Sequence, residues 1–424
     1  MKNIKRTLGI MLVCVVALAM TPAVSFANFG AQQVSKDGNW YYLADYSNST
    51  CKVIHWKGSS ATLAIPAKID GLKVVEVDFC YQCGTYTNSN IDNRDMITAI
   101  SIPSTVKTLD DYCFNNLTNL QSAVIPNTVT KLGSGMFSAC HSLKEFTFPS
   151  RFTAVPDSMF SGCTSLEKIT LPSGVTAIGS STFRSCSSLK SIKLPSKLKF
   201  IGAECFRESG LESISIPNSV KDMHYGSNFM DCASMKTVKL STGMTVLPGS
   251  CFKGCTSLET VTIPSCYKEI KFNAFAECSA LTTVVCQGNT ILNTYEAAVT
   301  PSAKVTIYGP KTKTMVNVPN YCNEKGVRFV PMNPPTMTSR VRSDSSATLQ
   351  WKKVSGATGY KVYEKVGNGS YRAVMTMGPN ATSYSCSGLN KGTAYRFYVT
   401  TLKTDVLGDT IESGRGSIYI TYLK

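Results

Sequence analysis

The sequence predicts a repeat solenoid with a parallel sheet along one face, followed by an all-β sandwich. Three observations lead to this expectation. Phenylalanine recurs every 23 residues through the middle of the chain, a short apolar segment ending in proline recurs with it, and the repeat stops at a proline cluster near residue 334. A phrase at a fixed period marks stacked structural units, whereas a catalytic motif normally occurs once.

The first residues are typical of a secretory leader. Basic residues precede an apolar run at residues 8–20, and Ser25-Phe26-Ala27 supplies a cleavage site. We therefore expect a signal peptide at residues 1–27 and a mature chain from Asn28. An uncleaved anchor is the alternative, but the run is shorter than the roughly 20 residues that span a bilayer. No later segment is apolar enough to cross a membrane, so no membrane span is expected in the mature chain.

Charge and composition limit the classes of partner. The formal net charge is +16, and the basic residues are spread through the chain. Nucleic-acid binding needs a clustered patch with a recognition element, so we expect no nucleic-acid partner. The charge favours either loose attraction to anionic glycans and wall polymers or simply a solvated basic surface. No L-P-x-T-G signal occurs near Lys424, so we expect a secreted or loosely cell-surface associated protein.

The repeat has the consensus L-x-x-I-x-L-P-x-x-V-x-x-I-x-x-x-x-F-x-x-C-x-S. Its phenylalanines are Phe114, Phe137, Phe160, Phe183, Phe206, Phe229, Phe252 and Phe275. The I-x-L positions alternate as in a strand with one buried face, and proline ends that strand because it has no amide to donate. The next apolar pair, such as Val175 and Ile178, turns the chain back across the core. One such coil cannot bury its own apolar face, but a stack of coils forms a continuous core.

These units resemble the BspA-like leucine-rich repeat proteins of bacterial surfaces. The stretch from Thr62 to Val77 is similar to the opening coil of that family, and residues 304–332 are similar to its closing strand, capping helix and last strand. The resemblance implies a leucine-rich repeat solenoid over residues 28–332. Two departures are an irregular polar insertion at residues 80–96 and Ser241, which replaces the proline in one coil.

Six cysteines share one repeat position, three residues after the phenylalanine: Cys140, Cys163, Cys186, Cys232, Cys255 and Cys278. Stacking would place neighbouring cysteines about 4.8 Å apart. Parallel side chains do not converge to the Cβ separation of roughly 3.8 Å that a disulfide prefers, so we expect free, buried thiols, with disulfides as the alternative. Histidines do not accompany the columns at ligand spacing, and no metal site is expected. Cys80 and Cys83 could form a bridge or half of a metal site.

Residues 333–424 follow a different pattern, in which short alternating strands are separated by glycine and asparagine turns. They resemble a fibronectin type III domain, which is an immunoglobulin-like sandwich. The resemblance is carried by Trp351, by Gly359 to Tyr363 and by Leu389 to Phe397. We interpret Trp351 and Tyr395 as core residues.

The chain offers little for catalysis. It has 3 histidines, no G-x-S-x-G, no H-E-x-x-H and no phosphate-binding glycine loop. A thiol hydrolase needs a cysteine activated by a nearby histidine, and Cys140 and His141, as neighbours in one coil, should point apart. Carboxylates such as Glu145 and Glu167 are scattered singly rather than paired. We expect no enzymatic activity and no cofactor.

The outward positions of the predicted sheet are the candidate binding residues. They form a face rich in hydroxyl and ammonium groups, without aromatic rings for stacking on sugars, and the candidates are Glu145, Lys168, Thr170, Lys193, Thr237 and Lys239. The family resemblance implies adhesion, with an extracellular protein, mucin or anionic glycan as partner. A carbohydrate- or cell-wall-binding accessory at the producer's own surface is the alternative. Threonine and serine also simply suit solvent-facing strands, and the oligomeric state is not predicted.

Overall fold

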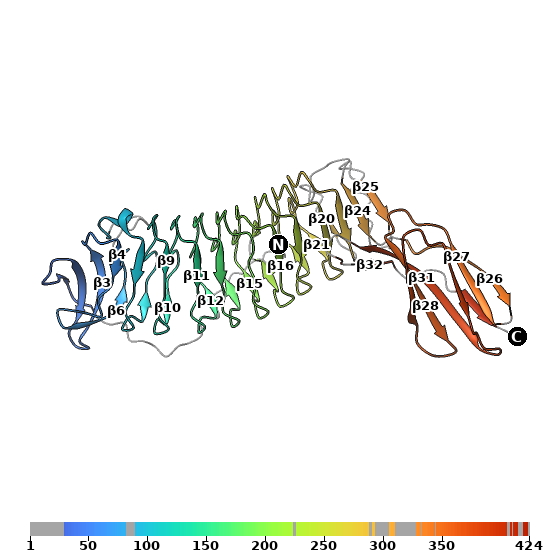
Figure 1. The fold of residues 1–424 in the computed structure, drawn as a ribbon, viewed down its shortest axis with the longest axis horizontal. Coiled ribbons are helices and arrows are strands. Elements are labelled where there is room, and N and C mark those ends of the chain that lie inside the picture. The colour runs from blue at the N-terminus through green and yellow to red at the C-terminus, as the bar shows by residue number, and fades with distance from the viewer. Residues whose placement is uncertain are drawn as a thin grey trace, which may run out of the picture.

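The computed structural model describes residues 29–81, 90–223, 226–287, 291–292, 305–309, 328–331, 333–343, 345–404, 408, 410–413 and 419–422. Within these ranges the chain forms a β-solenoid that leads into a strand-rich sandwich (Figure 1). The predicted fold class is therefore confirmed. The expected signal peptide at residues 1–27, Cys83 and the expected capping helix lie outside the described residues.

One side of the solenoid, the main sheet face, carries the I-x-L strand of each coil. Its strands are β4 (Thr62–Ala64), β7 (Ala99–Ser101), β9 (Ser122–Ala123), β11 (Glu145–Thr147), β13 (Lys168–Thr170), β16 (Ser213–Ser215), β18 (Thr237–Lys239), β20 (Thr260–Ile263), β22 (Thr283–Cys286), β24 (Thr306–Gly309) and β25 (Arg328–Pro331). All pairs on this face are parallel, as predicted. The ladder is interrupted, however, and its paired groups are β4-β7-β9, β11-β13, β16-β18 and β20-β22-β24-β25.

The next side of each coil, the second strand side, follows the proline. Its strands are β5 (Lys68–Ile69), β6 (Leu72–Val77), β8 (Thr108–Leu109), β10 (Lys131–Leu132), β12 (Ala154–Val155), β14 (Ala177–Ile178), β15 (Phe200–Ile201), β17 (Asp222–Met223), β19 (Val246–Leu247), β21 (Glu269–Ile270) and β23 (Ile291–Leu292). The 3-10 helix η1 (Arg94–Met96) lies between β6 and β7 in the chain. Ser241, where the repeat lacks proline, is buried, and its hydroxyl donates to the Val220 carbonyl at 2.9 Å.

The third side, the phenylalanine side, is a turn centred on the repeated phenylalanine. The residues two before and two after each phenylalanine have positive φ; around Phe206 they are Glu204 (φ 52°) and Glu208 (φ 58°). Backbone N–H groups of one turn donate to carbonyls of the next, as from Phe137 to Met159 at 2.9 Å. Most of these left-handed residues are not glycine, although this conformation costs an L-residue roughly 1–2 kcal/mol.

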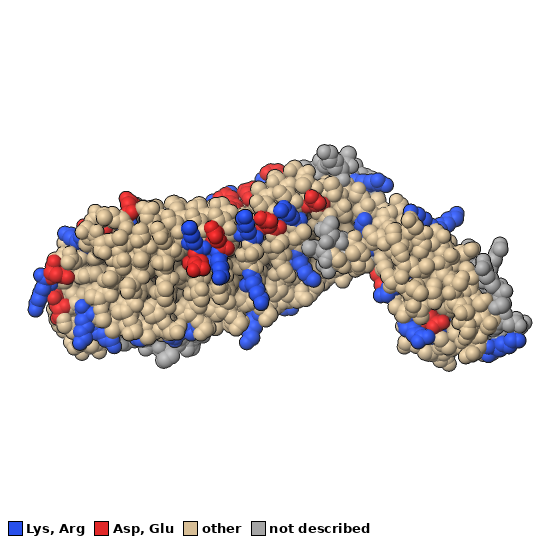
Figure 2. Space-filling view, in the orientation of Figure 1, with Lys and Arg blue, Asp and Glu red and all other residues tan. Residues whose placement is uncertain are grey.

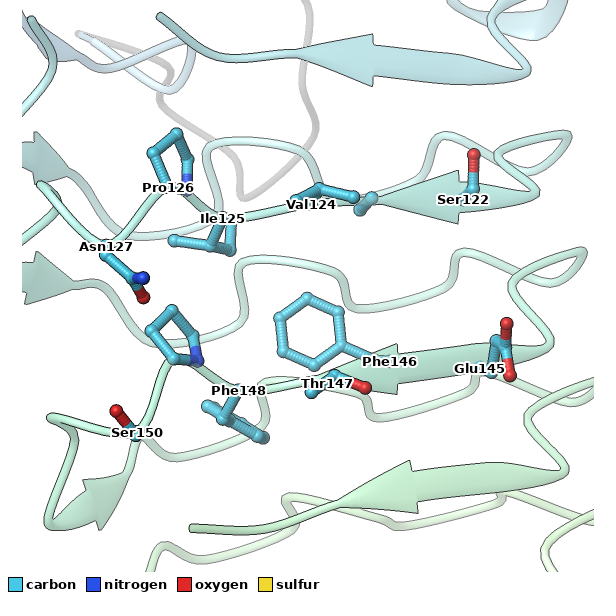
Figure 3. A pocket seen from close by; sticks show the side chains of 12 residues that line it. Ser122, Val124, Ile125, Pro126, Asn127, Glu145, Phe146, Thr147, Phe148 and Ser150 are labelled. Carbon is cyan, nitrogen blue, oxygen red and sulfur yellow. The ribbon is translucent and has the colours of Figure 1, made fainter. Parts of the chain in front are cut away.

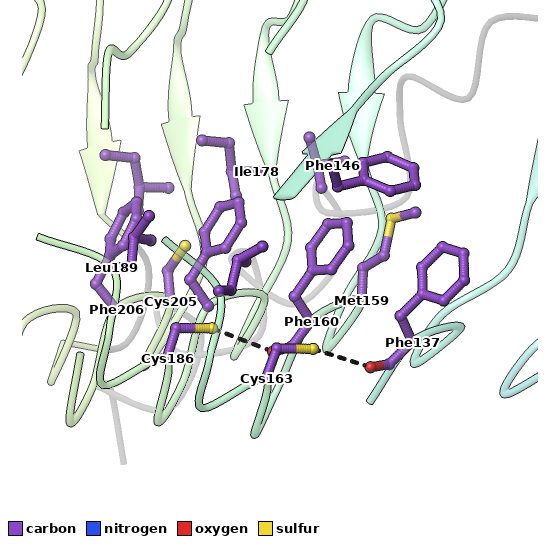
Figure 4. Close-up of a cluster of buried hydrophobic side chains, with 14 of the residues drawn as sticks. Phe137, Phe146, Met159, Phe160, Cys163, Ile178, Cys186, Leu189, Cys205 and Phe206 are labelled. Atoms are coloured by element: carbon purple, nitrogen blue, oxygen red, sulfur yellow. Dashed lines mark hydrogen bonds between the residues drawn. The ribbon is translucent and has the colours of Figure 1, made fainter. Parts of the chain in front are cut away.

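The phenylalanine rings form a continuous stack through the core. Phe206 is fully buried, and its ring centroid lies 5.4 Å from that of Phe183 and 5.3 Å from that of Phe229. Figure 4 shows several of these rings lying parallel beside the cysteine columns. The repeat therefore predicts the core correctly, because each coil contributes the same buried side chains to one cluster.

An antiparallel hairpin precedes the first coil. It consists of β1 (Gln32–Val34), β2 (Trp40–Asp45) and β3 (Thr50–Trp56), and β3 then pairs in parallel with β6. Buried Trp40 and Trp56 lie with ring centroids 6.2 Å apart over the end of the core. The hairpin thus covers the apolar end that a first coil would otherwise expose.

The sandwich contains two sheets. One consists of β26 (Met337–Ser343), β27 (Ser346–Trp351) and β30 (Ser383–Ser387), and the other of β28 (Gly359–Val366), β29 (Arg372–Met377), β31 (Ala394–Thr404), β32 (Thr410–Glu412) and β33 (Tyr419–Tyr422). Trp351 and Tyr395 are both buried in its core, as predicted. The Tyr395 hydroxyl accepts a hydrogen bond from the Asn390 N–H at 3.1 Å, which fixes the turn before β31.

The sandwich contacts the last described coils through Tyr308. The Nζ of Lys403 lies 4.4 Å from the centroid of the Tyr308 ring, a cation–π distance. A Cβ placed on Gly356, which has a φ of 78°, would lie 2.5 Å from Cε1 of the same ring. Only glycine fits this contact without a shift of the ring or the backbone.

Candidate functional site

The structure brings three of the predicted binding residues together on the main sheet face. Glu145 of β11 lies directly opposite Lys168 of β13, and Thr147 lies opposite Thr170. All four side chains are exposed. Strand alternation explains this, because Phe146 and Ile169 between them point toward the core.

The other three predicted residues lie further along the same face. Thr237, half-buried, and Lys239, exposed, belong to β18, where Lys239 lies opposite Ser215 of β16. Lys193 is exposed but lies outside any named strand, between the β11-β13 and β16-β18 pairs. The six residues therefore lie along one face but in separate paired groups. Their ammonium and hydroxyl groups can donate hydrogen bonds to carboxylates, sulfates or carbonyls of a partner.

A groove on this face escaped the sequence reasoning. It encloses about 610 Å³ and is lined by Ser122 to Asn127 of one coil and Glu145 to Ser150 of the next (Figure 3). Val124 on its rim is 74% exposed, although it is apolar. The sequence does mark this groove, because Phe146 and Phe148 occupy repeat positions where the following coil has the smaller residues Ile169 and Leu171.

Cys140 and His141 do not form a nucleophile and base. Cys140 is fully buried, and its Sγ donates to the Phe114 carbonyl at 3.3 Å. His141 is exposed, with Nδ1 2.9 Å from the Gly162 carbonyl. Burial raises the pKa of the Cys140 thiol to about 12, so almost none of it is thiolate at neutral pH.

The cysteine columns are free thiols, as predicted. Each thiol donates to the carbonyl of the phenylalanine 26 residues earlier, as from Cys163 to Phe137 at 3.1 Å (Figure 4). Ser209 takes the position between the two columns, with its Oγ 3.3 Å from Cys232 Sγ. Among the described residues no group of three His, Cys, Asp or Glu side chains is arranged to hold a metal ion.

Sequence reasoning also missed a charge cluster near the N-terminal end of the solenoid. The Nζ of Lys52 lies 2.8 Å from both Glu76 and Asp78 and 3.1 Å from Asp110, which also pairs with Lys131 at 3.0 Å. Burial opposes the charge on Lys52, but hydrogen bonds to Asp78 and Glu76 raise its pKa overall. The cluster joins β3, β6, β8 and β10, so its role is to connect the hairpin to the first coils.

On the face seen in Figure 2, basic and acidic groups alternate over the upper part of the middle of the solenoid, and basic groups alone lie below them. On the phenylalanine side, Arg184 pairs with Glu204 at 3.0 Å and Arg207 pairs with Glu208 at 3.1 Å. Because basic groups here are matched with acidic ones, this region does not act as a uniform cationic surface.

Two families match the chain. The BspA type leucine rich repeat region matches at residues 85–211 and 199–322, with 6 copies, and the fibronectin type III domain matches at residues 333–412. Neither match indicates an enzyme family. No curated protein matches the chain. Among the described residues, no helix has the length and apolar character needed to cross a membrane.

Solved structures with the same kind of repeat are similar to this chain. A leucine rich cell surface protein from Faecalibacterium prausnitzii A2-165 is 23% identical over 60% of this chain and 89% of its own, with a TM-score of 0.35. A leucine-rich repeat protein from Bacteroides ovatus is 18% identical over 69% and 97%, with a TM-score of 0.37. For the sandwich, a fibronectin type III domain of human collagen XX is 22% identical over 21% and 91%, with a TM-score of 0.18.

Proposed function

Because the chain belongs to the BspA-type leucine-rich repeat family and ends in a fibronectin type III domain, we propose that it is an exported recognition protein whose solenoid binds host or neighbouring-cell proteins or glycoconjugates. The family itself implies a protein-interaction role at the cell surface. The observation that carries the proposal is the exposed row of lysine, threonine and glutamate side chains along the main sheet face. A row of this kind contacts a partner at several coils at once.

The proposed organisation is a leader at residues 1–27, a solenoid at 28–332 and a sandwich at 333–424. The match of the fibronectin type III family from residue 333 supports the last boundary. N-terminal sequencing of the protein from culture supernatant and washed cells tests the leader, with Asn28 as the expected first residue. Recovery of an intact Met1 would contradict it.

A second candidate function is binding of carbohydrate or cell wall at the producer's own surface. The net charge of +16 favours it, because anionic polymers attract a basic protein without specific contacts. The two candidates differ in their response to salt, since charges further apart than about 10 Å are largely screened at 0.1 M ionic strength.

Binding of the full chain to matrix proteins, mucins, wall polymers and a glycan array at two salt concentrations separates these functions. The test variant combines Lys168→Ala, Lys193→Ala and Lys239→Ala. The control combines Lys199→Ala, Lys221→Ala and Lys268→Ala, which removes the same charge from exposed lysines next to second-side strands.

Saturable, salt-resistant binding to a protein or mucin that only the test variant loses supports the proposal. Equal loss in both variants, on anionic polymers alone, would leave charge as the mechanism and refute a specific face.

A further inference from the structure

The coil that contains Phe137 and the coil that contains Phe160 are joined on one side and open on another. On the phenylalanine side, N–H groups of Gly135, Phe137 and Ala139 donate to the next coil at 2.7 to 2.9 Å. On the main sheet face β9 pairs only with β7, and β11 pairs only with β13. On the second strand side β10 and β12 do not pair either. Outside these strands, the Ser142 N–H donates to the Thr118 carbonyl at 3.0 Å and Nη1 of Arg151 donates to the Asn127 carbonyl at 3.1 Å. The two coils therefore form a wedge that is joined on the phenylalanine side and bridged by these two bonds beyond the ends of β9 and β11.

The wedge has a cause in the sequence. Phe146 and Phe148 are 2% and 4% exposed, so both rings lie inside the core. The Phe146 ring is 5.0 Å from that of Phe160, 5.4 Å from that of Phe137 and 4.9 Å from that of Phe148. These rings need more room than the isoleucine and leucine of the next coil, and close-packed interiors accommodate extra volume by displacing backbone.

The opening between the coils runs along the strands. Its lining extends over six consecutive residues of each coil, which corresponds to about 20 Å of extended chain. The Phe146 ring lies between the two strands in the view of Figure 3. Polar side chains and exposed Val124 form the rim, and Glu145 is the one ionisable residue in the lining. The groove thus combines the exposed apolar side chain of Val124 with a single negative charge.

The chemistry of this groove selects an extended polypeptide. Facing edges of β9 and β11 carry backbone donors and acceptors at strand spacing, and only another peptide backbone supplies partners at that spacing. A strand between them needs about 9.6 Å, twice the usual separation of strands, whereas Cα atoms of β9 and β11 lie within 8 Å of each other, so the wedge must widen to admit a strand. No ladder hydrogen bond must break for this, because neither β9 with β11 nor β10 with β12 is paired, but the bond from Nη1 of Arg151 to the Asn127 carbonyl must yield.

We propose that the groove between β9 and β11 binds an extended segment of a partner protein by strand addition. An apolar side chain of that segment rests on exposed Val124, and a basic side chain lies beside Glu145. This inference rests on the proposed function, since it names the kind of partner and the place on the solenoid.

The test uses the full chain and a fluorescent octapeptide of alternating valine and threonine with a terminal lysine. Its analogue, N-methylated at alternate residues, cannot donate hydrogen bonds along one edge. The test variant, Phe146→Ile with Phe148→Leu, restores the residue types of the next coil and should close the wedge. The control variant, Ile214→Val with Ile216→Leu, alters the same two repeat positions in the coil of β16.

We expect saturable binding to the natural chain and the control, and at least tenfold weaker binding for the N-methylated peptide and for the test variant. Hydrogen exchange on the natural chain should show new protection at residues 122–125 and 145–148 when the peptide is bound. Equal affinity for both peptides, equal affinity of the test variant, or no saturable binding would overturn the inference. The exchange measurement decides the question if the test variant does not fold.

Failure of this inference is distinguishable from failure of the proposed function. If the octapeptide does not bind but protein binding is still lost in the triple lysine variant, only the groove is refuted. If the octapeptide binds and the triple lysine variant keeps full protein binding, the lysine face is refuted and the groove is supported.

Discussion

Replacing Phe206 with alanine should remove a large part of the stability of the solenoid. Phe206 is fully buried and stacks on two rings, at 5.4 Å and 5.3 Å. Phe→Ala in a core costs about 3–5 kcal/mol, and each aromatic contact adds about 0.5–1.5 kcal/mol. The expected loss is therefore about 4 kcal/mol or more, against a typical total of about 5–15 kcal/mol.

Phe272 provides the matched control, because it is the same residue type but 45% exposed. Since roughly half of its surface already meets water, Phe272→Ala should cost only about 1 kcal/mol. Urea unfolding followed by circular dichroism measures both losses. Because long repeat arrays can unfold in parts, hydrogen exchange should also show lost protection in the coils of Phe183 and Phe229. Equal losses for the two variants would refute the view that the ring stack holds the coils together.

Three further predictions follow from other contacts. Ala139 and Gly162 occupy the same left-handed position of neighbouring coils, at φ 58° and 76°. Ala139→Gly should therefore stabilise the protein by about 0.5–1 kcal/mol, and Gly162→Ala should destabilise it by a similar amount. Urea midpoints that move in the same direction for both variants would contradict this. Burial raises the thiol pKa to about 12 for Cys140, 11 for Cys232 and 12 for Cys278. The thiols of the unfolded chain therefore ionise first, so this contribution to stability is full below about pH 8.5 and falls as the pH rises above it. Urea midpoints measured in reductant from pH 8 to 10.5 should fall less steeply after Cys140→Ala, and an unchanged slope would count against the argument. Lys52→Met should lower the free energy of unfolding by about 2–4 kcal/mol, because it leaves three partly buried carboxylates together. Lys236→Met, at the exposed pair with Glu212, should lower it by less than about 1 kcal/mol. Equal shifts in melting temperature for the two variants would refute the distinction.

Most of the solenoid could be predicted from the sequence because one period places equivalent residues at equivalent sites. The regular spacing of the phenylalanines predicted the stack of buried rings, and the alternation of I-x-L predicted which side chains of the main sheet face are exposed to solvent. Cysteine position also predicted free thiols, since parallel side chains of stacked coils do not converge. Trp351 and Tyr395 in the sandwich core were likewise recognisable.

Other features depend on differences between coils, which a consensus averages away. Phe146 and Phe148 satisfy the apolar pattern, yet their size opens the groove beside β9. The left-handed positions are occupied by residues as different as Ser181, Glu204 and Gly254, so no glycine pattern marked them. The Lys52 cluster joins residues 58 positions apart, and only the pairing of the hairpin with the first coils brings them together.

The hydrogen bonds at the phenylalanine turns point in one direction along the solenoid. In the turns around Phe137, Phe160 and Phe183, the N–H of one coil points to the carbonyl of the following coil. Around the second strand side the direction is reversed, as from the Thr176 N–H back to the Thr153 carbonyl at 2.8 Å and from the Gly179 N–H back to the Val155 carbonyl at 2.9 Å. Amide dipoles that point in opposite directions largely cancel, whereas those of an α-helix are aligned and add. A solenoid of this type therefore grows by further coils without accumulating opposite charges at its two ends.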